Sequence, residues 1–224
     1  MKFGLARQLF RGSTTFAAFQ LECGMANKWK SAKSFADLCE LSAQWCEGKF
    51  ENTLTYLGKP DPESEPILPL LAKCNRAGFF TTFSQPGSGS PDDGNAQRAT
   101  VHGYADEELA RRLYALGLET SLLVLAFPPG FDNDVNIPIT LNDFQIYTWH
   151  GMTDGQPEKE DYRNQLTKDA YHSLLTSWQV ILIDTEWGRA DYLWDNLLEA
   201  IDGSESMFST IPPEELDLET DFVC

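Results

Sequence analysis

Two groups of polar residues stand where predicted strands end, and these residues are the best placed to form a binding site. In the first group, Ser84 and Gln85 precede a polar loop, and Gln97 and Arg98 follow it. If the two flanking strands pair, all four side chains gather at one edge of a sheet. Arginine presents a planar fork to a carboxylate or phosphate, while glutamine both donates and accepts hydrogen bonds. The competing interpretation is that the glutamines cap the hairpin and Arg98 pairs with an acid.

The second group follows an apolar strand predicted over 180–183 and contains Asp184, Glu186, Trp187 and Arg189. Trp187 is able to stack on a planar ligand, and Arg189 is able to bind an anion. Alternatively, an ion pair between Asp184 and Arg189 holds the turn from strand to helix. If both groups share one edge of the sheet, they form a single pocket with two arginines and an aromatic wall. The predicted ligand-binding residues are Ser84, Gln85, Gln97, Arg98, Trp187 and Arg189.

Catalytic chemistry has weaker support, and whether the protein is an enzyme stays open. No GxxxxGK[ST], GxGxxG, HExxH or GxSxG motif occurs in the sequence. Ser84, His102 and Asp184 are weak candidates for nucleophilic or proton-transfer chemistry, because a serine without a neighbouring base is only a hydrogen-bonding group. The three histidines are scattered, and no two have the spacing of metal ligands on a helix. We therefore predict neither a metal site nor a cofactor.

The composition is strongly acidic and argues against two classes of partner. The 224 residues include 17 Lys+Arg and 34 Asp+Glu, which gives a formal net charge of −17. Such a surface repels the phosphates of nucleic acids and of anionic membranes, so we predict neither as a partner. Residues 1–21 differ, because they contain Lys2, Arg7 and Arg11 and no acid. This segment resembles a transit peptide and equally fits a short element that docks on an acidic body.

The absence of a secretory signal and of a long apolar run predicts a cytoplasmic location. The five cysteines are odd in number and form no CxxC pair, which disfavours a disulfide framework. No apolar run reaches the length of about 18 residues that a membrane-spanning helix needs. We divide the chain into an N-terminal extension over 1–25, a single domain over 26–203 and an acidic C-terminal tail over 204–224.

Helical and strand patterns alternate irregularly along the predicted domain. Ser34 begins a helix, and Asp37 is placed to complete a capping box. Further helices are predicted over 64–77, 106–117, 161–178 and 191–202, and strands over 79–83, 97–104, 120–127, 180–183 and within 137–149. We expect Gly117 to end one helix, residues 88–95 to form a mobile loop and residues 120–127 to be a central strand. The order predicts an α+β (mixed α/β) fold with one central sheet of about five strands covered by helices.

Three strings in the sequence, NRAGFFTTFSQPG, QRATVHGYA and DTEWGRADYLWDNL, resemble an uncharacterised domain family common in actinobacteria, especially streptomycetes. The family carries an NRAGxxTxxSQPG…QRAxVxG core and a later WGR…LW segment, and the match covers about 29–104 and 184–197. The family has no known activity, so the resemblance implies a shared architecture and no particular chemistry. Its motif positions fall here on Asn75, Arg76, Ser84, Gln85, Pro86, Gly87, Gln97, Arg98, Trp187, Gly188 and Arg189.

Two functions from different classes follow from these observations. The first is a polar pocket that binds a small anionic or amide-bearing ligand, similar to a nucleotide or to a peptide end. The alternative is an acidic protein-interaction module, similar to immunity or inhibitor proteins, that binds a basic partner through its surface and tail. A ligand protein should lose binding in Arg98→Ala, whereas an interaction module should bind in a strongly salt-dependent way. The sequence determines neither the ligand nor the oligomeric state.

Overall fold

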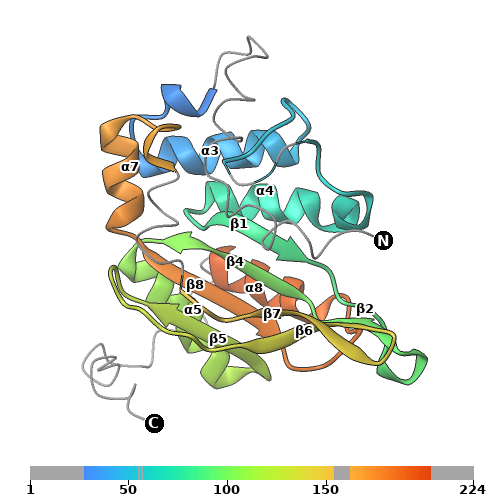
Figure 1. The fold of residues 1–224 in the computed structure, drawn as a ribbon. Coiled ribbons are helices and arrows are strands. Elements are labelled where there is room, and N and C mark those ends of the chain that lie inside the picture. The colour runs from blue at the N-terminus through green and yellow to red at the C-terminus, as the bar shows by residue number, and fades with distance from the viewer. Residues whose placement is uncertain (1–27, 55, 57, 154–161, 203–224) are drawn as a thin grey trace.

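The computed structural model describes residues 28–54, 56, 58–153 and 162–202, and within them the chain forms two four-stranded antiparallel sheets and five α-helices (Figure 1). The predicted extension over 1–25 and the predicted tail over 204–224 lie outside the described residues. The first sheet has the order β1 (Phe80–Gln85), β4 (Thr100–Ala105), β8 (Trp178–Asp184) and β5 (Leu122–Phe127). The second has the order β2 (Ser88–Ser90), β3 (Asn95–Gln97), β6 (Ile137–Asn142) and β7 (Gln145–His150).

The predicted α+β class is confirmed, but the prediction of one central sheet with about five strands is wrong. The segment that was expected to be a mobile loop forms the hairpin β2–β3 around the short 3-10 helix η3 (Pro91–Asp93). Gly94 allows this hairpin because its φ of +76° lies in the left-handed region that glycine enters without strain. The predicted strand over 97–104 is also divided. Arg98 and Ala99 carry the chain from β3 in the second sheet to β4 in the first.

The helices are α3 (Phe35–Cys46), α4 (Leu68–Arg76), α5 (Glu107–Glu119), α7 (Lys168–Leu175) and α8 (Tyr192–Asp202), with 3-10 helices η1 (Lys28–Ser31) and η2 (Pro62–Ile67). Ser34 and Asp37 form the expected capping box at the start of α3. Gly117 does not end α5, and the helix expected over 161–178 is shorter, because Trp178 already belongs to β8. No helix among the described residues has both the length and the apolar composition needed to cross a bilayer.

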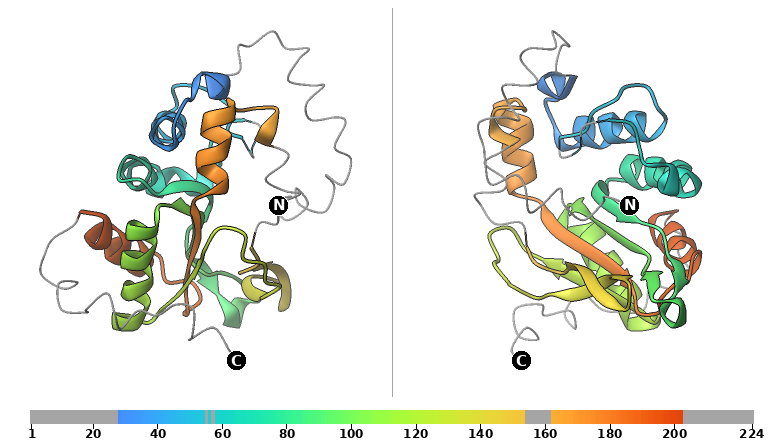
Figure 2. Two further views of the ribbon diagram at one scale, coloured as in Figure 1. Left: turned by 90° about the vertical axis from the view of Figure 1, so that its left-hand side faces the viewer. Right: turned by 45° about the vertical axis from the view of Figure 1, so that its right-hand side comes forward.

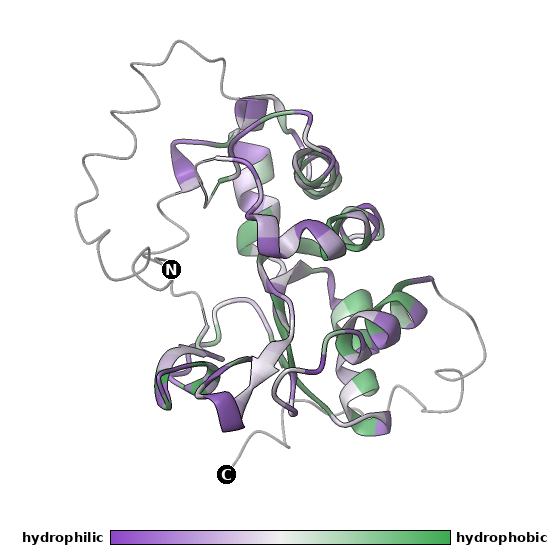
Figure 3. Cartoon of the chain, turned by 90° about the vertical axis from the view of Figure 1, so that its right-hand side faces the viewer, coloured by the Kyte–Doolittle hydropathy of each residue, from purple (hydrophilic) through white to green (hydrophobic). Residues whose placement is uncertain are grey.

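The first sheet lies between helices on one face and the second sheet on the other, as the views in Figure 2 show. Alternation along the strands explains this, because successive side chains of a strand point to opposite faces. In β8, Val180 and Leu182 pack with α4, α5 and α8, whereas Ile181 and Ile183 pack with the second sheet. The helices therefore combine hydrophobic and hydrophilic residues, as Figure 3 shows.

The apolar run predicted to be a central strand forms β5, which is an edge strand of the first sheet. Its apolar composition arises because both faces are nevertheless covered. Leu122 and Val124 pack in the core on the helical side, while Leu123 and Leu125 pack against the core between the two sheets. Residues 28–54 and α7 cover the remaining part of the second face, around Trp29, Phe80 and Tyr104.

Candidate functional site

The two polar groups lie side by side at one edge of the molecule. Because β4 and β8 pair with Thr100 opposite Ile183, the chain before β4 runs beside the chain after β8. Two backbone hydrogen bonds extend this pairing, from the N–H of Asp184 to the carbonyl of Ala99 at 2.8 Å and from the N–H of Gly188 to the carbonyl of Gln97 at 2.9 Å. The arrangement places the β3–β4 linker, which carries Arg98, against the β8–α8 loop.

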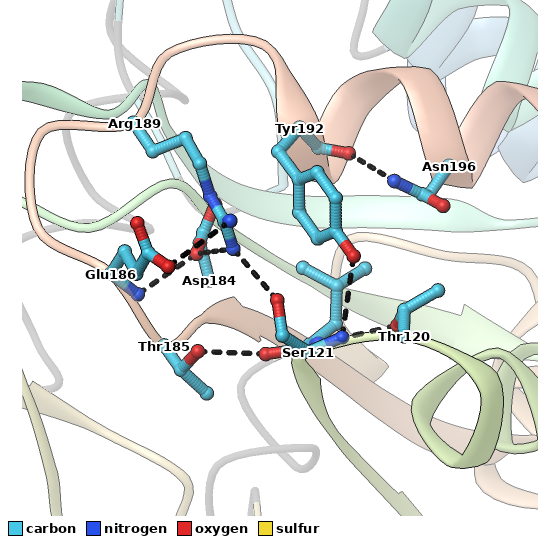
Figure 4. Close-up of polar contacts among 9 residues, drawn as sticks. Thr120, Ser121, Asp184, Thr185, Glu186, Arg189, Tyr192 and Asn196 are labelled. Atoms are coloured by element: carbon cyan, nitrogen blue, oxygen red, sulfur yellow. Dashed lines mark hydrogen bonds and ion pairs between the residues drawn. The ribbon is translucent and has the colours of Figure 1, made fainter.

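Arg189 is held by its own chain (Figure 4). Its Nε and Nη2 atoms donate to the two carboxylate oxygens of the fully buried Asp184 at 2.7 and 2.6 Å. Nη2 also donates to the hydroxyl of Ser121 at 3.0 Å, and the guanidinium lies 3.7 Å from the ring centroid of Tyr192. The hydrogen bonds with Asp184 raise the pKa of Arg189. This geometry matches the ion-pair interpretation, in which Asp184 and Arg189 hold the turn into α8.

Arg98 differs from Arg189 because no carboxylate binds it among the described residues. Its guanidinium carbon lies 4.5 Å from the centroid of the Trp187 ring, so one face of that ring is already covered. Its Nε atom is buried and has no hydrogen-bond partner within the described part of the chain. Burial lowers the pKa of the Arg98 guanidinium, and the nearby charge of Asp184 opposes that shift. Arg98 is therefore a partly buried cation on an aromatic face, without an acid partner in the described chain.

Gln85 lies on the opposite, inner side of this region, where its amide joins the two sheets. The Nε2 atom donates to the carbonyls of Arg98 and Ile139, both at 3.0 Å, and the Oε1 atom accepts from the hydroxyl of Thr140 at 3.1 Å. Both amide hydrogens are thus used within the protein. The side chain is 8 % exposed. Gln85 therefore has a connecting role in this geometry, and a ligand would have to displace two buried hydrogen bonds to use it.

The three weak catalytic candidates do not form a nucleophile–base pair. Ser84 pairs with Val101, which faces the helices, whereas His102 is the next residue of β4 and faces the second sheet. His102 is buried, and its ring centroid lies 5.1 Å from that of His150 on β7. Asp184 is engaged by Arg189. No described contact therefore supplies Ser84 with a base.

The start of the family-like motif is also engaged within the structure. Asn75 is fully buried at the end of α4, where its Nδ2 atom donates to the carbonyl of Leu71 at 2.8 Å and to the hydroxyl of Thr81 at 2.7 Å. Its Oδ1 atom accepts from the backbone N–H of Thr81 at 3.0 Å. Arg76 binds the exposed carboxylates of Glu40 and Glu47. These two residues join α4 to β1 and to α3.

A groove of about 340 Å³ opens beside the two polar groups. Gln97 is the one predicted binding residue that lines it, together with Ser88, whose hydroxyl donates to the Oε1 atom of Gln97 at 2.9 Å. The other walls come from η2 and α4, from the β1–β2 linker and from the first turn of α8. They contribute the apolar residues Pro66, Ile67, Leu70, Pro86 and Trp194 and the acids Glu63, Asp191 and Asp195.

The acidic and aromatic lining was missed in the sequence analysis, although part of it left a signal. Asp191 and Asp195 are four residues apart and Trp194 is three residues from Asp191, so all three project from one side of α8. This stretch was used only to predict a helix over 191–202. Glu63 had no such signal, because it comes from a turn-rich segment more than a hundred residues away in the chain.

Two glycines, of which Gly87 lines the groove, allow the β8–α8 loop to contact the chain at residues 87–89. A Cβ atom on Gly87 would lie 2.0 Å from the carbonyl oxygen of Arg189, and one on Gly188 would lie 2.1 Å from the carbonyl oxygen of Gly89. Such contacts are far shorter than van der Waals separations, so only glycine fits. The close approach at Gly87 is therefore made by the β8–α8 loop.

Comparison with known proteins places the chain in a family. A family model described as "Domain of unknown function (DUF6919)" matches residues 24–204, which is most of the chain. No curated protein matches the chain.

Proposed function

We propose that this chain, which belongs to the family described as Domain of unknown function (DUF6919), binds a small amide-bearing ligand with a positively charged amino group in the groove beside Gln97. A peptide end has this chemistry. The volume of the groove, about 340 Å³, lies at the lower end of the range typical of small-molecule sites, roughly 300–1,000 Å³.

The charge of the groove selects for a cation. Glu63, Asp191 and Asp195 line it, and no Lys or Arg is among its lining residues. None of the three carboxylates makes a salt bridge to another residue in the described part of the chain. An amino group that enters the groove therefore meets uncompensated negative charge, which an anion would have to overcome.

The observation that carries the proposal is the indole N–H of Trp194. Trp194 lines the groove and is 3 % exposed, yet its Nε1 atom has no hydrogen-bond partner among the described residues. Leaving a buried donor without a partner costs about 1–3 kcal/mol, so most such groups in proteins are satisfied. We infer that a ligand carbonyl accepts from this N–H and recovers that cost, which requires binding to bring the buried N–H to the surface of the groove.

Gln97 adds an uncharged polar side chain to the lining of the groove. Its Oε1 atom accepts from Ser88, and its amide nitrogen makes no hydrogen bond within the described chain. An amide nitrogen carries two donors, so Gln97 is able to bind a second carbonyl oxygen of the ligand. The combination of carboxylates for the amino group and N–H donors for carbonyl oxygens favours the peptide-like form of the ligand over the nucleotide-like form.

A small anionic ligand is the second candidate, and Arg98 is the observation that favours it. The two polar groups contain two arginines. Arg189 is already bound by Asp184, whereas Arg98 has no carboxylate partner among the described residues. In this case the anion would bind the exposed edge of the Arg98 guanidinium, and the groove would be secondary.

The proposal is tested by calorimetry with leucinamide, which has both the amino cation and the amide carbonyl, against N-acetyl-leucinamide, which lacks the cation. We expect leucinamide to bind, and Trp194→Phe and Asp195→Asn each to weaken binding at least about tenfold, which corresponds to about 1.4 kcal/mol. Trp45→Phe is the matched control, because its indole N–H donates to the carbonyl of Gly58 at 3.0 Å, and Trp45 does not line the groove.

Equal binding of both probes, or full binding by Trp194→Phe, would contradict the proposal. If inorganic phosphate binds instead and Arg98→Gln abolishes that binding, the anionic candidate replaces it.

We further propose a cytoplasmic location, supported by the described thiols. Cys39, Cys46 and Cys74 are free and buried, and burial raises the pKa of each to about 12. Thiols in this state behave as small hydrophobic groups and suit a reducing compartment. Location of the tagged full chain by microscopy tests this point.

A further inference from the structure

Strand β7 has one open edge within the described part of the structure. It pairs with β6 on one side and is the last strand in the order of the second sheet (Figure 1). The open edge of a strand presents backbone N–H and C=O groups that another extended segment is able to bind. Proteins usually protect such an edge with Lys, with Pro or with charged side chains. The sequence of β7, QIYTWH, contains none of these.

Exposed apolar side chains are concentrated on and around this strand. Seven of the ten large hydrophobic residues that are exposed in the described structure fall between residues 131 and 152. We call four of them the β7 surface, because they belong to β7 and to the turn before it. The β7 surface consists of Phe144 (72 % exposed), Ile146, Tyr147 and Trp149 (50 % exposed). Tyr147 and Trp149 alternate along β7 and so share one face of the strand, the face opposite to His150, whose ring packs against Phe83 and His102 of the first sheet. Exposed aromatic residues that share a face are typical of interaction sites.

The charge around the β7 surface specifies the sign of its partner. No Lys or Arg occurs between residues 113 and 158, and this stretch contains six acids. Among them, Asp132, Asp134 and Asp143 lie on the segments next to β6 and β7. A basic partner is attracted to such a surface, and a second copy of this acidic chain is repelled by it.

We infer that the β7 surface docks an extended, basic segment of another protein, which adds a strand to the open edge of β7. The backbone of the segment pairs with the N–H and C=O groups on the open edge of β7, and its apolar side chains cover Tyr147 and Trp149. Its Lys or Arg side chains lie near the acids of the flanking loops. This surface is distinct from the groove beside Gln97, and its function is independent of the ligand proposed there.

The test uses the full chain and two short synthetic peptides, one in which Lys alternates with Val and Thr, and a second in which Glu replaces each Lys. We expect the Lys peptide to bind with an affinity that falls as salt rises from about 0.05 to about 0.5 M, and the Glu peptide not to bind. Trp149→Lys should weaken binding by at least about tenfold, because it removes an aromatic contact and adds a repelling charge. Trp149→Glu should weaken binding less, because it removes the same ring and adds an attracting charge.

Leu118→Lys is the matched control and should leave binding unchanged. Leu118 is 61 % exposed, but it lies on α5, on the helical side of the first sheet. Trp194→Phe should also bind the Lys peptide fully, which separates this inference from the groove.

Four results would overturn the inference. The first is no binding of the Lys peptide at about 1 mM, and the second is equal binding of both peptides. The third is a dimer in sedimentation that Trp149→Lys dissociates, which would assign the edge to a second copy. The fourth is binding that appears only after deletion of residues 1–21 or 204–224, which would assign the edge to the chain itself.

Discussion

Replacement of Arg189 by Gln tests how much the ion pair with Asp184 contributes to stability. Asp184 is fully buried, and without the guanidinium its carboxylate keeps, among the described residues, only the hydrogen bond from the backbone N–H of Glu186 at 2.9 Å. The change removes two charged hydrogen bonds, of 2.6 and 2.7 Å, and the 3.0 Å bond to Ser121. Removing one partner of a buried ion pair typically costs about 3–5 kcal/mol. We therefore expect the free energy of unfolding to fall by that amount and Tm to fall by roughly 6–20 °C.

Urea denaturation followed by far-UV circular dichroism measures this loss by linear extrapolation. Arg76→Gln is the matched control, because Arg76 also makes charged hydrogen bonds to carboxylates, those of Glu40 and Glu47, but these side chains reach solvent. Water and salt screen exposed pairs, so this control should lose far less stability.

The double variant Asp184→Asn with Arg189→Gln separates the buried charge from the lost packing. If the cost of Arg189→Gln arises from an unpaired buried carboxylate, neutralising that carboxylate should restore a large part of the stability. The reasoning is refuted if Arg189→Gln loses no more stability than Arg76→Gln, or if the double variant loses the sum of the two single changes.

Three further changes have expected outcomes that the same denaturation assay checks. Gly87→Ala should destabilise the protein by more than about 1 kcal/mol, because its Cβ atom would lie 2.0 Å from the carbonyl oxygen of Arg189; an unchanged midpoint would show that the loops separate freely. Gln85→Leu should cost about 1–3 kcal/mol, because it removes the hydrogen bonds from this amide to the carbonyls of Arg98 and Ile139 and takes away the acceptor of the Thr140 hydroxyl, and a neutral result would contradict the connecting role of this amide. Hydrogen bonds from Arg76 and Lys49 lower the pKa of Glu47 to about 2, so the stability that Glu47 contributes is complete above its unfolded pKa, near 4.5, and disappears as pH falls towards 2. The stability difference between the native chain and Glu47→Gln should therefore vanish over that range, and a difference that persists at pH 2 would argue against the pKa shift.

Local features of the fold could be predicted where neighbouring residues decide them. The start of α3 follows from Ser34 and Asp37, which satisfy each other's backbone N–H groups within one turn. The buried strands β5 and β8 follow from their continuous apolar residues, since both faces of each strand are covered. The division between β3 and β4 could not be predicted, because it depends on β6, which pairs with β3 and lies about forty residues further along the chain.

In the candidate site, too, features that depend on neighbouring residues could be predicted, and features that depend on distant residues could not. The sequence by itself identified both polar groups and the alternative that Asp184 and Arg189 pair, because these residues stand directly after strands and close together in the chain. Only the tertiary structure decided which polar groups are already bound and which are free, because the deciding partners are distant. Gln85 contacts a carbonyl 54 residues away, and Arg189 contacts a hydroxyl 68 residues away. The acidic groove likewise combines Glu63 of η2 with residues of α8. These two segments are distant in the chain, so the residue pattern of η2 does not predict that it lies beside α8.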